Sequence, residues 1–170
     1  MTDDVTADLP SLGLGNIIPA RLVLLAPIPL TTGLFFCLES RLEHQEGTSV
    51  RPVRALDMYL ILSSAFLAFA LAALLEMTGG SHHSLAAARN VLFFVGLLLI
   101  FRPVLGQGTS VLPMAWVCVV FLTGYRSPRD PYPWSIIPEP LGAVHAWIGA
   151  LGAFGLGTLF HFFVSSRRGL

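Results

Sequence analysis

Lysine is missing from the sequence, and charge of either sign is scarce. All ten cationic side chains are arginine, ten acidic side chains balance them, and charged residues occupy 12% of the 170 positions. A soluble domain of this size carries roughly twice that charged fraction. Without lysine the chain has no G-x-x-x-x-G-K-[ST] nucleotide-binding loop, so any coupled ATP hydrolysis needs another polypeptide. The neutral balance and the lack of a basic stripe argue against a nucleic-acid partner.

Other signatures of catalysis and metal binding are also missing. Neither G-x-S-x-G nor H-E-x-x-H occurs in the sequence. The two cysteines, Cys37 and Cys118, have no C-x-x-C spacing and lie in or beside apolar runs, which predicts buried free thiols. His82 and His83 are adjacent in a Gly/Ser-rich turn with no third ligand close in sequence, so we predict neither a metal site nor a cofactor.

Hydrophobic residues, by contrast, make up 54% of the chain. A membrane-spanning helix needs about 20 mostly apolar residues, and five stretches reach or approach this length. We therefore predict an all-α, polytopic transmembrane bundle of about five helices in the cell membrane, with no soluble domain. The predicted spans are about 17–38, 56–77, 85–105, 109–125 and 141–164, and a re-entrant pair is the alternative for the third and fourth.

The two ends of the chain are predicted to flank this bundle as short tails. Residues 1–16 are acidic and lack the basic region of a signal peptide, so we expect the first apolar segment to be retained. Residues 165–170 carry Arg167 and Arg168. Arginine counts in the short connections weakly favour a cytoplasmic C-terminus. One side collects Arg41, Arg51, Arg54, Arg102, Arg167 and Arg168, and the other collects Arg21, Arg89, Arg126 and Arg129.

Prolines mark two places where a regular helix is interrupted. Pro27 and Pro29 lie inside the first predicted span, where they should kink the helix and form either a tolerated bend or a hinge. Five prolines in residues 126–140 forbid a regular helix there. Tyr132 and Trp134 in this segment prefer the headgroup region, so we predict an interfacial segment that lies on the membrane.

Small residues at four-residue spacing form ridges on two predicted helices. Such ridges let helix backbones approach closely in a membrane, so we predict helix packing at these positions. The ridges are Ser64, Ala68 and Ala72 on the second helix, and Gly149, Ala153 and Gly157 on the last, with a further set at Gly142, Ala146 and Ala150.

Arg89 and Asn90, at the entrance of the third span, are the best candidates for a functional site. A polar pair at this depth either snorkels and hydrogen-bonds near the helix end, or lines a transport path or holds a neighbouring helix. Asp57 and Glu76 are candidate countercharges for Arg89. No catalytic residue is predicted.

The C-terminal half resembles actinobacterial membrane proteins of the ABC-2-type permease kind. The features are Ala88-Arg89-Asn90 entering an apolar run with Gly96, Leu112-Pro113 opening the next helix, Pro133-Trp134, and a last helix rich in Ala and Gly. The resemblance covers about residues 86–160, and only the order of the motifs carries weight. It implies a membrane subunit that works with a separate ATP-binding partner, although such permeases have six spans per half and this chain has about five.

These observations lead to three functional hypotheses. The first is a permease-like subunit of an export system, for example of the ABC type with a separate ATPase, which would assemble as a homo-oligomer or with other subunits. The second is a non-catalytic partner or scaffold in a larger membrane complex. The third is a small intramembrane enzyme using Cys37, Asp57, His145 and His161.

Overall fold

The computed structural model describes residues 6–11, 16–45, 53–79, 83–127 and 130–167, and their side chains at 24–38, 56–79, 83–106, 108–127 and 130–162. This part is mostly helical. The α-helices are α1 (Pro27–Gln45), α2 (Val53–Met77), α3 (Ser84–Leu105), α4 (Leu112–Thr123) and α5 (Val144–Arg167). The 3₁₀-helices are η1 (Leu22–Leu25) and η2 (Gly106–Val111), and the strands are β1 (Thr6–Ser11), β2 (Asn16–Arg21), β3 (Tyr125–Ser127) and β4 (Asp130–Pro131).

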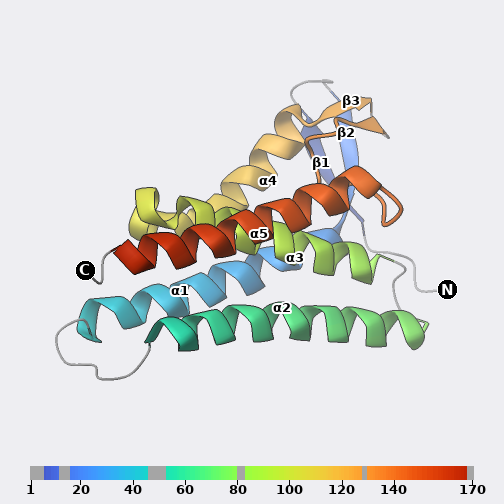
Figure 1. The fold of residues 1–170 in the computed structure, drawn as a ribbon. Helices are drawn as coiled ribbons and strands as arrows, with labels where there is room; N and C mark the ends of the chain where they lie inside the picture. Colours follow the sequence, from blue (N-terminus) through green and yellow to red (C-terminus); the bar gives the residue numbers. More distant parts are fainter. Residues whose placement is uncertain (1–5, 12–15, 46–52, 80–82, 128–129, 168–170) are drawn as a thin grey trace.

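The helices run back and forth along one long axis. Helices α1, α3 and α5 point one way, and α2 and α4 point the other way (Figure 1). The strands and the connection between α4 and α5 therefore gather at one end of the bundle, where α3 and α5 begin (Figure 1). We call this the strand end. The opposite end holds the end of α1, the start of α2 and η2.

Two of the described helices, α2 and α3, are long and apolar enough to cross a membrane. At 1.5 Å per residue, the apolar part of α2 is roughly 33 Å long, close to the thickness of a bilayer core. The two helices differ sharply in their surroundings. In the most apolar 18-residue stretch of α3, 78% is buried inside the chain, whereas in that of α2 only 22% is buried.

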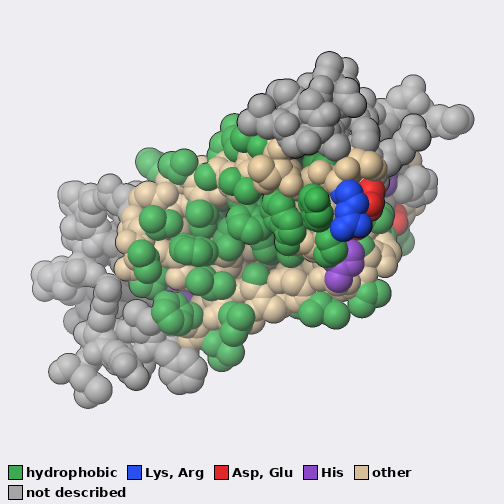
Figure 2. Space-filling view, turned by 90° about the horizontal axis from the view of Figure 1, so that it is seen from above, with side chains coloured by type: hydrophobic (Ala, Val, Ile, Leu, Met, Phe, Trp, Pro, Cys, Tyr) green, Lys and Arg blue, Asp and Glu red, His purple; other side chains and the backbone are tan. Residues whose placement is uncertain are grey.

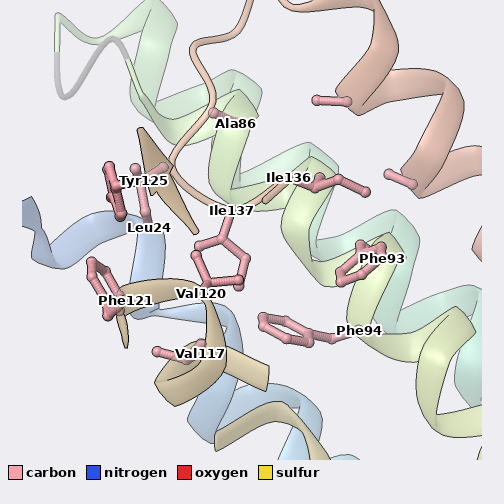
Figure 3. Packing of buried hydrophobic residues seen from close by; sticks show 12 residues of the cluster. Leu24, Ala86, Phe93, Phe94, Val117, Val120, Phe121, Tyr125, Ile136 and Ile137 are labelled. Carbon is pink, nitrogen blue, oxygen red and sulfur yellow. The ribbon is translucent and has the colours of Figure 1, made fainter. Parts of the chain in front are cut away.

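Helix α3 is the centre of the bundle. It packs most extensively against α5 and also contacts α2 and α1. One face contributes Phe93 and Phe94 to a cluster with α4 and the α4–α5 connection, and Phe94 points toward Val117 and Val120 (Figure 3). Another face joins α1 and α2 in a second cluster, formed by Phe35, Leu38, Ile61, Val91, Val95, Leu98 and Leu99.

The first predicted span, 17–38, differs from the structure. Its first part forms strand β2 and the 3₁₀-helix η1, and α1 begins only at Pro27. The predicted hinge at Pro27 and Pro29 therefore lies at the start of α1 and not in the middle of a spanning helix. Both prolines lie in the first turn, where backbone N–H groups have no partner within the helix and proline costs nothing. The Thr31 hydroxyl reinforces this turn by donating to the Pro27 carbonyl oxygen (2.7 Å).

The predicted N-terminal tail also contains regular structure. Strands β1 and β2 pair antiparallel from Thr6 opposite Arg21 to Ser11 opposite Asn16. Residues 1–5 and 12–15 lie outside the described residues. The first of these strands packs near α4 at the strand end (Figure 1), so residues 6–11 and 16–21 belong to the fold.

The other predicted helices agree with the structure more closely. Helices α2 and α3 match the predicted spans 56–77 and 85–105 to within three residues at each end, and α5 is displaced by three residues from 141–164. The fourth span is split between η2 and α4. Helix α1 continues beyond the predicted first span to Gln45, and α2 starts at Val53, while residues 46–52 lie outside the described part.

Candidate functional site

The connection between α4 and α5 folds back against the first turns of α3. Its middle residues Ser135, Ile136 and Ile137 are buried. The Ser135 hydroxyl hydrogen-bonds to the carbonyl oxygens of Gly124 (2.9 Å) and Tyr132 (2.7 Å). These contacts close the connection on itself and turn its remaining carbonyl groups toward α3.

Arg89 is the largest completely buried side chain among the described residues. Its Nη2 donates to the carbonyl oxygens of Ile136 (2.8 Å) and Glu139 (2.9 Å), and its Nη1 donates to that of Pro140 (3.1 Å). The planar guanidinium presents five N–H donors in a fixed fork. The α4–α5 connection supplies backbone acceptors that match this fork.

Asn90 completes the arrangement. Its Oδ1 accepts from Nε (3.3 Å) and Nη2 (3.1 Å) of Arg89, and its Nδ2 donates to the carbonyl oxygen of Ile137 (3.1 Å). The two adjacent side chains thus bind four carbonyl groups within residues 136–140. We call Arg89, Asn90 and these four carbonyl groups the polar clamp.

One carboxylate lies beside the polar clamp. The Glu139 side chain is nearly buried, and its negative charge stabilises the positive charge of Arg89. Its Oε1 also lies 3.3 Å from Nε2 of His145, a half-exposed residue in the first turn of α5. The guanidinium is therefore compensated by carbonyl dipoles and by one nearby anion, which is what a buried charge requires.

This geometry favours a structural role for Arg89 and Asn90. Every nitrogen of the guanidinium has at least one acceptor within the chain, and most of the donors are used in these bonds. The predicted countercharge Asp57 is buried but lies near the start of α2. Because α2 and α3 are antiparallel, Asp57 and Arg89 are roughly 20 Å apart along the bundle at 1.5 Å per residue. The pairing of Asp57 with Arg89 is wrong, and Glu139 takes that place.

The predicted packing ridge of α5 is used inside the chain. A Cβ added to Gly96 of α3 would overlap the backbone of Ala153 and Phe154, and one added to Gly157 would lie 2.5 Å from the Gly96 carbonyl oxygen. Gly149 faces Ile136 of the connection instead, and a Cβ added to Gly149 would lie 2.6 Å from the Cδ1 of Ile136. Glycine is therefore required where α3 and α5 meet backbone to backbone.

The ridge on α2 is less tightly packed. Ala72 is buried, whereas Ser64 and Ala68 are half-buried. Ser64 donates its hydroxyl to the Ile61 carbonyl oxygen of its own helix (2.8 Å), and Ala68 borders the cluster that joins α2 to α3. This side of α2 faces α3, and its other side is open.

Two residues of the enzyme hypothesis, His145 and His161, are roughly 24 Å apart along α5 and so cannot share a site. Among the described residues no group of three or more His, Cys, Asp or Glu side chains is placed to hold a metal ion. Cys37 and Cys118 are exposed, so the prediction of buried thiols is wrong. Both lie on the outer faces of α1 and α4, which the sequence could not distinguish from inner faces in such uniformly apolar helices.

The segment predicted to lie on the membrane has an outer part with Tyr132 and Trp134 and an inner part that is buried. Their rings stack at 6.5 Å, and Trp134 is 41% exposed. The guanidinium carbon of Arg126 lies 5.3 Å from the centre of the Tyr132 ring. The residues that follow turn inward to the polar clamp, so the segment does not lie flat on a surface.

Comparison with family models, curated proteins and solved structures finds no match to this chain. The resemblance to ABC-2-type permeases therefore stays a prediction. The functional argument rests on the geometry of the chain itself.

Proposed function

We propose that the chain is an integral membrane protein that serves as a non-catalytic subunit of a larger membrane complex. The observation that carries the membrane assignment is the outer face of α2. Large apolar side chains are exposed along its whole length, and they are Leu56, Tyr59, Leu62, Phe66, Leu67, Leu71, Leu74, Leu75 and Met77. An apolar surface of this extent is costly in water and is solvated by lipid or by another protein.

Helix α5 and the arrangement of charge support the same proposal. Val144, Ile148, Leu151 and Leu156 are exposed on α5. In Figure 2 hydrophobic side chains cover the middle of the face seen from above, and the blue and red side chains of that face lie toward one end. An apolar surface along the middle of the helices, with charged side chains toward their ends, is the pattern expected of helices that cross a bilayer.

The remaining helices have lengths that allow them to cross as well. Helix α1 is roughly 28 Å long, and η2 with α4 extends over about 30 Å at 2.0 and 1.5 Å per residue. The alternating direction of α1 to α5 accommodates five crossings. With the C-terminus in the cytoplasm, as the arginine distribution favours, the strand end faces outward.

The choice of a subunit role rests on what the polar residues do. Arg89 and Asn90 use their donors within the polar clamp, and the α5 ridge packs against α3. The outer faces of α2 and α5 are then the surfaces left for contact with lipid or partners. A permease-like subunit with a separate ATPase is the alternative. It would need a polar path, and the clamp does not supply one in this conformation.

Membrane integration is tested first by extraction of cell membranes with alkaline carbonate. An integral protein stays in the pellet, whereas a soluble or peripheral protein is released to the supernatant. Release of the full-length chain would overturn the proposal. A known peripheral protein and a known integral protein, probed on the same blot, serve as controls.

The subunit role is tested by photocrosslinking from outward positions. A benzophenone amino acid at Phe66 or Leu71 of α2 is compared with the same probe at Ile148 of α5 and Phe36 of α1, which are also exposed. We expect protein adducts from α2 in native membranes. Adducts with lipid alone from all four positions would overturn the subunit role. An adduct with an ATP-binding protein would favour the permease-like alternative.

A further inference from the structure

A chain of aromatic rings in contact connects the surface of the strand end to the core. Tyr132 stacks on Trp134, Trp134 meets Trp116 of α4 edge to face at 6.3 Å, and Trp116 lies 5.5 Å from Phe93 of α3. Arg126 covers the outer end, with its guanidinium carbon 5.3 Å from the centre of the Tyr132 ring. The buried end is fixed by the core, so the outer rings are held in place.

The outer end of this aromatic chain lies where the apolar part of the bundle stops. Arg126 is in β3, directly after the end of α4, and β3 pairs with β4 at the strand end (Figure 1). One turn along α4 from Trp116, Val119 is exposed on the same side of the helix. A cation, two aromatic rings and an exposed apolar side chain of α4 therefore lie near one another at the strand end.

The chemistry of this surface matches a phospholipid. Stacking on Tyr132 occupies a face of the guanidinium and leaves its N–H edges available for bidentate hydrogen bonds to a phosphate. Arg126 is exposed, and the described residues contain no ion pair that uses it. Tyr and Trp rings favour the headgroup depth, and the apolar face of α4 suits an acyl chain.

We infer that Arg126, Tyr132 and Trp134 bind the headgroup phosphate of an anionic phospholipid at the strand end, with its acyl chain along α4. This inference rests on the proposed location of the bundle in a membrane. The apolar face beside the cation selects a lipid over free phosphate. One arginine near a surface favours an anionic over a zwitterionic lipid by about fivefold, which corresponds to about 1 kcal/mol. Asp130 in the paired strand is the nearby opposing charge.

The experiment uses the full-length chain reconstituted into phosphatidylcholine vesicles. A minor fraction of the lipid is replaced either by brominated phosphatidylglycerol or by the same fraction of brominated phosphatidylcholine. Bromine quenches tryptophan fluorescence on contact. Trp147→Phe in every sample leaves Trp116 and Trp134 as the two reporters, since the sequence has three tryptophans. We expect about fivefold local enrichment of the brominated phosphatidylglycerol.

Variants separate charge from folding. Arg126→Gln should reduce the enrichment to none, and Arg126→Lys should keep part of it because the charge remains while the planar stack is lost. Asp130→Asn is the matched control in the paired strand, and it should keep or raise the enrichment. Circular dichroism in the same vesicles establishes that each variant is folded.

The possible results separate this site from the membrane proposal. Equal quenching by both brominated lipids in the parent protein would overturn the lipid site, as would enrichment that survives in Arg126→Gln. Quenching by neither lipid, with protein that does not float with the vesicles, would overturn the membrane location and the lipid site together.

Discussion

Replacement of Arg89 by methionine tests the polar clamp directly. Methionine is unbranched and of similar length, so the change removes the guanidinium while it keeps most of the packing. The carbonyl oxygens of Ile136, Glu139 and Pro140 then lose their donor, and the Oδ1 of Asn90 loses both of its bonds. The α4–α5 connection keeps only the Asn90 bond to Ile137 from the clamp.

The magnitude follows from these bonds. An unsatisfied buried acceptor costs about 1–3 kcal/mol, so three carbonyl groups set an upper range of about 3–9 kcal/mol if nothing moves. Release of the connection lets water reach the carbonyl groups and limits the loss. We expect Arg89→Met to lower the free energy of unfolding by about 3–5 kcal/mol, the usual cost of breaking a buried charged network.

The assay is reversible unfolding by SDS in mixed micelles, followed by far-ultraviolet circular dichroism. Hydrogen exchange of the backbone amides of residues 130–143 gives the local readout. We expect Arg89→Met to accelerate exchange in these residues more than in α2. Arg126→Met is the matched control, because Arg126 is exposed and contributes a cation–π contact of about 0.5–1 kcal/mol. Equal losses in the two variants, or unchanged exchange in residues 130–143 after Arg89→Met, would refute the clamp.

Four further substitutions test other contacts by the same unfolding assay. Gly96→Ala should lower the free energy of unfolding by about 2 kcal/mol or more, because the new methyl group meets the backbone of α5. Gly33→Ala is the control, because nothing lies within 4 Å of the added methyl group, and it should raise the free energy of unfolding by about 0.5–1 kcal/mol. A change of the same sign in both variants would contradict the close approach of α3 and α5. Ser135→Ala should cost about 1–2 kcal/mol, since its buried hydroxyl bonds two carbonyl groups, and a neutral result would mean that water replaces it. Trp147→Phe removes the bond from Nε1 to the Leu141 carbonyl oxygen (2.9 Å) and should cost about 1 kcal/mol, so a larger loss would show that indole packing dominates.

The long helices were the predictable part of the fold. Helices α2, α3 and α5 coincide with uninterrupted apolar runs, because apolar length alone indicates a helix when few polar residues break it. The same uniformity hides which side of each helix is buried. The exposed Cys37 and Cys118 show this, since residues around the whole circumference of their helices are apolar.

The N-terminal region was harder to predict because its signals conflict. Residues 17–38 are apolar enough for a span, but Pro19 and Pro27 divide them into a strand, a 3₁₀-helix and the first turn of α1. Proline is compatible with an edge strand and with the start of a helix, and apolar content alone reports neither. The hairpin of β1 and β2 carries no strong alternation of polar and apolar residues.

The polar clamp was half visible in the sequence. Arg89 and Asn90 stand out as polar residues in an apolar run, whereas their acceptors are backbone carbonyl groups, which every residue has. One signal was present. Pro138 and Pro140, among the five prolines of residues 126–140, leave carbonyl groups that no regular structure can pair. A proline-rich connection near a buried arginine offers the acceptors that the arginine needs.

The polar clamp also dictates an order of events during synthesis. The acceptors of Arg89 lie 47 to 51 residues after it in the chain, and Gly96 meets its partners on α5 later still. When α3 leaves the ribosome, the Oδ1 of Asn90 is present among the acceptors of Arg89, but the carbonyl groups of residues 136–140 are not. Water or another polar group must then take the place of these carbonyl groups. The central helix thus gains its full set of contacts only after the last helix emerges.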